Sequence, residues 1–195
     1  MATAMAPPTE YTPTRYRFTV DDFHLMAEAG ILTSNPRVEL IEGDITQMSP
    51  VGGPHANCGD ALTRLFAPLA GTVARLRVQN AVRLSEDTEV QPDISIVTER
   101  VYGNDLPGVG DVLLLIEVAD ATLVSDRDIK IPLYSRFGIP QSILVDVKRS
   151  HVWHFTDPRD AGYRHTRMYA SGDQFEIALT PALRLTIKVD DLFSA

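Results

Sequence analysis

The sequence predicts one domain of the α/β (α+β) class, and three patterns lead to that prediction. Residues 112–118 form an almost continuous apolar run, which is typical of a central strand buried on both faces. A helical pattern at 126–137 and a second apolar strand at 142–147 follow it, so these segments together form a β-α-β unit. Alternating segments on either side of the unit indicate further antiparallel strands. The length of 195 residues is sufficient for one such domain to bury a full core.

The N-terminal part of the chain is expected to be a tail followed by a capped helix. Residues 1–14 are rich in Ala, Thr and Pro and lack the charged and apolar regions of a signal peptide, so we interpret them as a flexible tail. The single domain then spans residues 15–195. Thr19 is placed to cap a helix over residues 20–29, and Gly30 is placed to end it.

A hairpin, a helix and three short strands are expected next. Residues 37–48 alternate between apolar and polar positions, which predicts a β-hairpin with Gly43 in its turn. Leucine and phenylalanine recur at helical spacing over residues 55–69, which predicts an amphipathic helix. Strands are then predicted at residues 72–79, 81–84 and 94–97.

The helix inside the β-α-β unit contains Pro132, which bears on where that helix begins. Because proline has no N–H to donate and favours the first turn, the helix is expected to begin near Asp128 rather than at the start of its apolar pattern. Gly138 is placed to end it. Beyond the unit, antiparallel strands are predicted at residues 152–155, 163–169 and 183–187.

The composition restricts the classes of function. A formal net charge of -8 argues against a protein that binds nucleic acid only by neutralising phosphate, because such proteins are usually basic. It is compatible with a nuclease, since a metal site needs clustered carboxylates and bound cations offset their charge. Cys58 is the only cysteine, so the chain forms no intrachain disulfide, which fits a reducing cytoplasm. The longest apolar run, residues 112–116, is too short to cross a membrane.

Two carboxylates at strand ends carry the chemical signal. Asp93 stands where a strand begins, after Gln91-Pro92, and Glu117 ends the apolar strand that comes next. Acidic side chains at the ends of neighbouring strands can converge on one divalent cation, and their hard oxygens suit Mg²⁺ or Mn²⁺. An ionised glutamate in so apolar a run is costly unless something pairs with it. On these residues alone, Glu117 could also end its strand in solvent.

Several blocks of sequence follow one another over residues 37–146. They are Arg37-Val-Glu-Leu-Ile-Glu-Gly-Asp-Ile, Met48-Ser-Pro with His55, Gln91-Pro-Asp-Ile-Ser-Ile-Val, Leu115-Ile-Glu-Val, Asp126-Arg-Asp-Ile-Lys-Ile-Pro-Leu-Tyr-Ser-Arg-Phe-Gly-Ile-Pro and Leu144-Val-Asp. A strand-rich segment ending in Asp191-Leu-Phe comes after them. In content and order these blocks closely resemble the Uma-type family of restriction-endonuclease-like proteins, within the PD-(D/E)XK nuclease superfamily.

The resemblance implies a restriction-endonuclease-like fold, in which helices flank a mixed central β-sheet, and a metal-dependent endonuclease activity. The catalytic positions that it implies are Asp93, Glu117, Lys130, Glu39 and His55. The usual superfamily lysine lies two residues after the acidic residue, but Ala119 occupies that position here. The resemblance therefore places the lysine on the following helix, as Lys130. We expect Asp93 and Glu117 to share one cation, with one of their two pKa values raised, at a cleft bordered by Glu39 and Lys130.

Each candidate also has a purely structural interpretation. Glu39 lies on an alternating strand, where a polar residue normally faces water. His55 follows Gly-Gly-Pro and could cap its helix. Lys130 could be an exposed lysine paired with Asp126, one turn earlier. Among other polar residues, we expect a core position for Tyr134, a local ion pair for Asp146, an apolar environment for Cys58, and no shared metal for His151 and His154.

The leading hypothesis is a Mg²⁺- or Mn²⁺-dependent endonuclease that hydrolyses phosphodiester bonds of nucleic acid, with DNA favoured. Asp93, Glu117 and Glu39 would hold the metal, and Lys130, Arg127 and Arg64 would contact phosphate. The main alternative is a domain of the same fold that does not cleave and instead binds nucleic acid or a protein partner. A hydrolase of small phosphorylated substrates is a third hypothesis. We also expect a homodimer, without membrane attachment, because one site per chain cleaves two strands most easily in a dimer.

Overall fold

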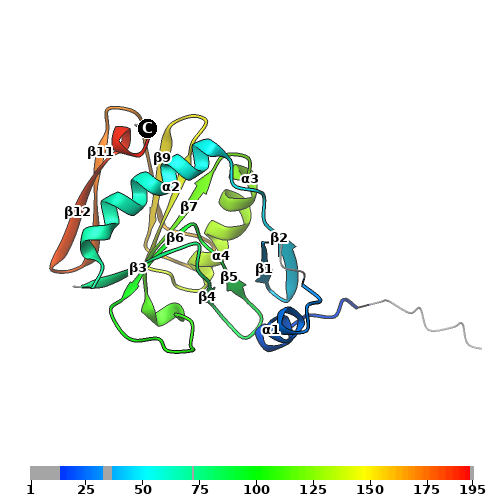
Figure 1. Ribbon diagram of the computed structural model, residues 1–195. Helices are drawn as coiled ribbons and strands as arrows, with labels where there is room; N and C mark the ends of the chain where they lie inside the picture. Colours follow the sequence, from blue (N-terminus) through cyan, green and yellow to red (C-terminus); the bar gives the residue numbers. More distant parts are fainter. Residues whose placement is uncertain (1–13, 33–36, 72, 194–195) are drawn as a thin grey trace, which may run out of the picture.

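The computed structural model describes residues 14–32, 37–71 and 73–193. The predicted tail, residues 1–14, lies outside the described residues except for Thr14. Figure 1 shows a central sheet with α2 (Gly53–Phe66) packed on one face and α4 (Ile131–Arg136) on the other. The hairpin that contains β1 (Val38–Ile41) stands beside this layered body.

The central sheet has six strands in the order β10-β9-β8-β7-β6-β3. Their bounds are β3 (Ala74–Val78), β6 (Ile94–Thr98), β7 (Val112–Ala119), β8 (Gln141–Asp146), β9 (His151–Thr156) and β10 (His165–Tyr169). β7 and β8 are parallel, and the other neighbouring strands in this sheet are antiparallel. The parallel pair and the helix between its strands form the predicted β-α-β unit. The mixed sheet confirms the predicted fold class.

A second sheet, in the order β2-β1-β5-β4, contains the predicted hairpin. Besides β1 it consists of β2 (Asp44–Gln47), β4 (Val82–Arg83) and β5 (Glu89–Val90). Ile41 pairs with Asp44, which leaves Glu42 and Gly43 as the turn. Their φ values of 50° and 78° are those of a type I′ turn, whose twist matches that of the strands. β5 is not predicted from the sequence, because two residues are too few to show alternation.

The remaining strands, β11 (Gln174–Thr180) and β12 (Leu183–Lys188), form an antiparallel pair. They pack against the same face of the central sheet as α2, through Phe175, Ile177 and Ile187. The sequence prediction includes β12 but omits β11, although its buried and exposed residues alternate regularly. The short pair completes the apolar layer on this face.

The helices in the first half of the chain start as their sequences predict. Thr19 caps α1 (Val20–Glu28): its hydroxyl accepts the Asp22 N–H, and the Asp22 carboxylate accepts the Thr19 N–H. Gly30 follows α1 with a φ of 71°. α2 begins at Gly53, slightly before the predicted start, and its last turn leads into a 3₁₀ turn over Ala67–Leu69.

The helical segment after β7 starts earlier than the position of Pro132 suggests. It consists of α3 (Leu123–Ser125), a π-helical turn (Asp126–Lys130) and α4, so the predicted start near Asp128 is wrong. The Ile131 N–H donates to the carbonyl of Asp126, which is the wider spacing of a π turn. This wider turn allows the helix to continue through a proline that lacks an N–H.

Two apolar layers fill the space on either side of the central sheet. The layer under α2 includes Cys58, Leu62, Phe66, Ile94, Ile96, Leu114, Ile116 and Val118. The layer under α4 includes Val97, Leu115, Ala119, Leu133, Tyr134 and Leu144. Residues alternate along β7 between these layers, so Glu117 points toward the α4 side. No helix in the part of the chain that the structure describes combines the length and hydropathy of a membrane span.

Replacing Gly43 with alanine is expected to destabilise the protein by about 1–3 kcal/mol. A Cβ at this position would lie 2.7 Å from Cβ of Arg17, and the φ of 78° disfavours any residue with a side chain. The matched control is Gly59→Ala in α2, where no atom beyond the neighbouring backbone of the helix lies within 4 Å of the Cβ position. That control should stabilise the helix by about 0.5–1 kcal/mol. Urea unfolding measures the stability of both variants. Equal stabilities of Gly43→Ala and Gly59→Ala would contradict the strain assigned to a side chain at the turn.

Candidate active site

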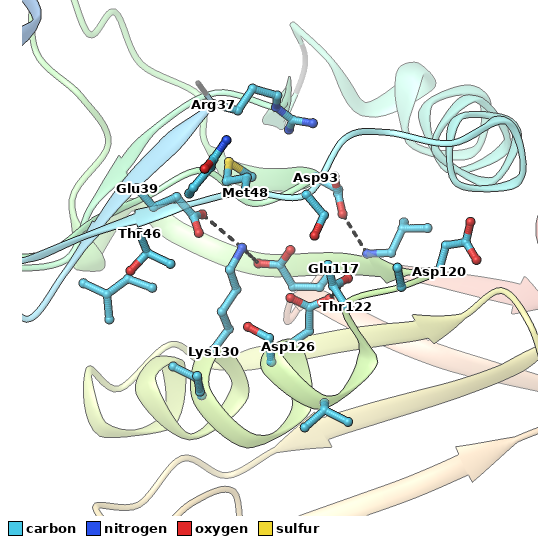
Figure 2. A pocket seen from close by; sticks show the side chains of 18 of the residues that line it. Arg37, Glu39, Thr46, Met48, Asp93, Glu117, Asp120, Thr122, Asp126 and Lys130 are labelled. Atoms are coloured by element: carbon cyan, nitrogen blue, oxygen red, sulfur yellow. Dashed lines mark hydrogen bonds and ion pairs between the residues drawn. The ribbon is translucent and has the colours of Figure 1, made fainter. Parts of the chain in front are cut away.

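One cavity of about 890 Å³ collects the candidate residues. It lies between the β1–β2 hairpin, the start of α2 and the helical segment that begins with α3. Its acidic lining residues are Glu39, Glu42, Asp44, Asp93, Glu117, Asp120, Asp126 and Asp128. Its basic lining residues are Arg37, His55 and Lys130. Figure 2 shows Lys130 and Asp126 reaching into the cavity from the same helical segment. So many carboxylates around one space favour a bound cation.

Asp93 and Glu117 stand opposite each other at the start of β6 and on β7. Ile94 pairs with Ile116 in this antiparallel pair, so Asp93 and Glu117 are the next two residues in register. Directly opposed residues of a regular pair have Cβ atoms about 4.5–5.5 Å apart and share one face of the sheet. The backbone ties them further, because the N–H of Val118 donates to Asp93 Oδ2 at 2.8 Å. Both side chains line the same cavity.

Lys130 is buried between two of the acidic residues. Its Nζ lies 3.0 Å from Oε1 of Glu39 and 3.3 Å from Oε1 of Glu117. Burial opposes the charge of the ammonium, but the carboxylates of Glu117 and Glu39 outweigh burial and raise the pKa of Lys130. Only 8% of the side chain is exposed, so the interpretation of Lys130 as an exposed lysine paired with Asp126 is wrong.

Glu117 is almost completely buried, as Glu39 is. Burial raises its pKa well above the ordinary glutamate value, and the nearby charges of Asp126, Asp93 and Glu39 add to this effect while Lys130 opposes it. The hydroxyl of Tyr134 donates a hydrogen bond to Glu117 Oε1. The raised pKa agrees with the expected shift for one member of the Asp93–Glu117 pair. Tyr134 is fully buried, and it also contacts the site directly.

Asp93 remains acidic despite its burial. Desolvation raises the pKa of Asp93. His55, the Val118 N–H and Lys130 lower it by more than desolvation raises it, so the net shift of the Asp93 pKa is downward. Nε2 of His55 lies 3.1 Å from Asp93 Oδ2. The cap of α2 is Gly52, so the alternative interpretation of His55 as a helix cap is wrong. His55 instead reaches from the first turn of α2 to one of the two facing carboxylates.

Glu39 is buried on β1, where alternation alone suggests a solvent-facing side chain. Its Oε1 accepts the backbone N–H of Gln91 at 2.6 Å and the ammonium of Lys130 at 3.0 Å. Only 3% of the residue is exposed, so the interpretation as a solvated strand face is wrong. The segment that leads into Asp93 covers this face of the hairpin. Glu39 thus connects the hairpin to Gln91, near Asp93, and to Lys130 on the helical segment.

The donor set suits a hard divalent cation in its chemistry. The described residues contain no group of three His, Cys, Asp or Glu side chains already arranged around a metal position. Within the same described ranges, Oε2 of Glu117 and Oε2 of Glu39 have no hydrogen-bond partner, because Lys130 and the other donors use Oε1. Asp93 and Glu117 could therefore hold one Mg²⁺ or Mn²⁺ whose remaining ligands are mostly water, as Mg²⁺ prefers. Glu39 could join them through Oε2.

Two predicted phosphate-binding residues are not among the residues that line the cavity. Arg127 does not line the cavity, although it pairs at 2.7 Å with Asp128, which does. Arg64 is exposed in the last turn of α2 and does not line it either. Of the predicted basic set, Lys130 is the member that the structure brings to the carboxylates.

Asp126 and Arg37 line the cavity but are not site candidates in the sequence analysis. Asp126 is buried and accepts a hydrogen bond from Thr122 at 2.5 Å, and burial raises its pKa. Both residues lie inside the sequence blocks that carry the family resemblance, so position in those blocks was the available signal. Elsewhere, Asp146 pairs with Arg149 at 3.0 Å and Cys58 is buried, as predicted.

Comparison with known proteins gives a family and a fold. The Uma2 family model, described as "putative restriction endonuclease", matches residues 20–188. The structure is similar to a crystal structure described as a putative nuclease belonging to DUF820 from Anabaena variabilis, with a TM-score of 0.67 and 18% sequence identity. That similarity covers 90% of this chain and 97% of the other. No protein with curated annotation matches the chain. The shared fold is restriction-endonuclease-like.

Proposed function

The chain belongs to the Uma2 family of restriction-endonuclease-like proteins, and on that premise we propose that it is a Mg²⁺-dependent endonuclease whose substrate is DNA. The observation that carries this proposal is the register of β6 and β7, which sets Asp93 opposite Glu117 in a cavity that also contains Lys130. Two facing carboxylates and a buried ammonium match what phosphodiester hydrolysis requires. The carboxylates hold a cation, and the ammonium meets the charge of the phosphate.

The carboxylates would divide their oxygens between the protein and the cation. Lys130 binds Oε1 of Glu39 and of Glu117, so their Oε2 atoms are available to Mg²⁺ or Mn²⁺. His55 and the Val118 N–H bind Oδ2 of Asp93, which leaves Oδ1 with only the Gln79 amide at 3.5 Å. Mg²⁺ bound there would lower the pKa of a coordinated water and offset charge on the phosphate.

Lys130 would act on the phosphate rather than on the metal. Hydrolysis forms a bond from a water oxygen to phosphorus and breaks the bond to the leaving nucleotide oxygen, while negative charge grows on the phosphate oxygens. The ammonium is compact, is held by Glu39, and stays protonated because its pKa is raised. A fixed charge in a buried site stabilises such a transition state without having to reorganise.

A plasmid-nicking assay with purified protein tests the proposal. We expect relaxed plasmid to accumulate with Mg²⁺ or Mn²⁺ and not with EDTA, and we expect Asp93→Ala and Glu117→Ala to abolish it. Asp60→Ala is the matched control, because Asp60 is exposed on α2 and does not line the cavity. Plasmid binding without nicking at any metal concentration would favour the non-cleaving alternative. Cleavage of bis(p-nitrophenyl) phosphate alone would favour the small-substrate hydrolase, and cleavage of RNA alone would change the assigned nucleic acid.

The proposal includes an assembly and a location. One cavity per chain would cleave both strands of a duplex most simply as a homodimer, with residues 15–195 forming the single domain of each subunit. Cys58 is buried and its pKa is raised to about 12 by burial, so this thiol is unreactive and suits a reducing cytoplasm. Sedimentation velocity with and without a DNA duplex tests the dimer.

A further inference from the structure

Arg37 is a cation in the cavity for which the described residues provide no carboxylate partner. It lies immediately before β1, and its backbone carbonyl accepts the N–H of Met48 at 2.8 Å, which fixes it at the open end of the hairpin. Its side chain lines the cavity and is half-buried. Nη2 of its guanidinium is buried and has no hydrogen-bond partner in the part of the chain that the structure describes. Figure 2 shows Arg37 on the side of the cavity opposite the helix that carries Lys130.

This arrangement is unusual because the cavity is rich in carboxylates. Lys130, the other cationic side chain of the lining, is already paired with Glu39 and Glu117. Arg37 forms no ion pair with any carboxylate among residues 14–32, 37–71 and 73–193. A buried N–H without an acceptor is costly, so a ligand that supplies an oxygen there gains that free energy. An anion that enters the cavity could supply such an oxygen and also match the charge of the guanidinium.

We infer that Arg37 binds a non-bridging oxygen of a phosphate in the substrate strand, adjacent to the phosphate that is cleaved. This inference rests on the proposed function, because the cleaved phosphate is assigned to Asp93, Glu117 and Lys130. Those three residues are almost completely buried, whereas Arg37 is only half-buried on the far side of the cavity. A phosphate at Arg37 is therefore a neighbour along the strand. The planar guanidinium can donate two parallel hydrogen bonds to it.

Such a contact explains how an acidic protein can bind a polyanion. With a formal net charge of -8, the protein has no general attraction for nucleic acid. Arg37 supplies a local positive charge beside the cleavage position, and contacts to phosphate fix the position of a strand without reading its sequence. Arg37 is thus a substrate-positioning residue that does not touch the reacting bond.

The test is a cycle that combines protein variants with modified DNA. Arg37→Gln and Arg37→Lys are compared with wild type for binding of a fluorescent DNA duplex, measured by anisotropy with Ca²⁺ in place of Mg²⁺, and for cleavage with Mg²⁺. Neutral methylphosphonate linkages replace one phosphate at a time along the duplex. Arg167→Gln on β10 is the matched control, since Arg167 is exposed, has no ion pair among the described residues and does not line the cavity. Thermal melting verifies that each variant is folded.

We expect Arg37→Gln to weaken binding and raise KM by about 10- to 100-fold, with a smaller change in kcat. The slope of log Kd against log salt concentration should decrease by about 0.9. Arg37→Lys should retain the slope and lose part of the affinity. At one linkage next to the cleavage position, methylphosphonate and Arg37→Gln should have no additive effect, because both remove the same contact.

Other outcomes separate this inference from the proposed function. Additive effects at every linkage, or an equal loss of affinity in Arg167→Gln, would overturn the role of Arg37 and leave the nuclease intact. Non-additivity at the cleaved phosphate itself would overturn the assignment to a neighbour. If the duplex binds but is not cleaved, the proposed function fails. The binding measurements with Arg37→Gln and the methylphosphonate linkages still decide the role of Arg37. If wild type binds neither DNA nor RNA, the inference is wrong.

Discussion

Replacing Lys130 with alanine is expected to lower the rate of cleavage by about 10²- to 10³-fold, the cost of removing one fixed charge from a transition state. Ala119 occupies the position of the usual superfamily lysine and carries no charge. The ammonium of Lys130 contacts both Glu39 and Glu117. Among the described residues that line the cavity there is no second lysine to replace it. Lys130→Arg should rescue little, because a planar guanidinium does not fit the space of a buried ammonium.

The same substitution should also reduce the stability of the metal-free protein. It leaves two buried carboxylates without their shared cation, and breaking a buried pair in this way costs about 3–5 kcal/mol. Glu39→Gln combined with Lys130→Ala removes one of the uncompensated charges and should regain part of the loss. Urea unfolding measures this, and cleavage rates are compared at a temperature where both variants are folded. A wild-type rate in Lys130→Ala would show that the phosphate charge is met by another residue, while the Asp93–Glu117 metal site would stand.

Glu117→Gln is expected to have opposite effects on stability without and with metal. In metal-free protein, burial and the charges of Asp126, Asp93 and Glu39 outweigh the attraction of Lys130 and raise the pKa of Glu117, so a neutral glutamine should raise the free energy of unfolding at a pH where Glu117 is ionised. With free Mg²⁺ at about 10 to 100 times Kd, wild type should gain about 1.4–2.7 kcal/mol from binding, whereas the variant should gain little. Cleavage should be lost. Denaturant unfolding with EDTA and with Mg²⁺ measures the difference in free energy of unfolding between wild type and variant in each condition.

The pH dependence of wild type gives an independent check. A carboxyl group whose pKa is raised on folding binds protons more readily in the folded state, so its contribution to stability declines as pH rises from the ordinary glutamate value toward the raised pKa. Without metal, wild type should therefore lose stability relative to Glu117→Gln between mildly acidic and neutral pH. Parallel pH profiles for the two proteins would contradict the raised pKa of Glu117.

The strand that carries Glu117 shows what the sequence can predict. An apolar run interrupted by one acid indicates a buried strand with a functional residue, and the helix and strand after it indicate a parallel neighbour. The Pro-Asp pair at the start of the preceding strand indicates Asp93, and the family resemblance then selects Lys130. Hydrophobic pattern and short-range turn residues are local properties, which is why β7, the hairpin turn at Gly43 and the cap of α1 agree with their predictions.

The environment of the same residues could not be predicted, because it depends on distant parts of the chain. Alternation places Glu39 on the polar face of β1, but the partners that bury it are 52 and 91 residues away. Helical spacing pairs Lys130 with Asp126, although its actual partners are on two strands. The rule for proline predicts a helix start near Asp128, and a π turn overrides that rule. Arg64 and Arg127 are close to the site in sequence or on its helices, yet neither lines the cavity.

The ion pair between Lys130 and Glu39, 91 residues apart, also makes assembly of the candidate site depend on long-range folding. Contacts at such separation form late in folding, because closing a long loop costs entropy before the contact is gained. Until the helical segment docks, Glu39 and Glu117 lack their common cation and remain more stable in water than buried together. Partly folded chains therefore have no assembled site. A nascent chain cannot complete the candidate site before Lys130 has left the ribosome and packed against Glu39.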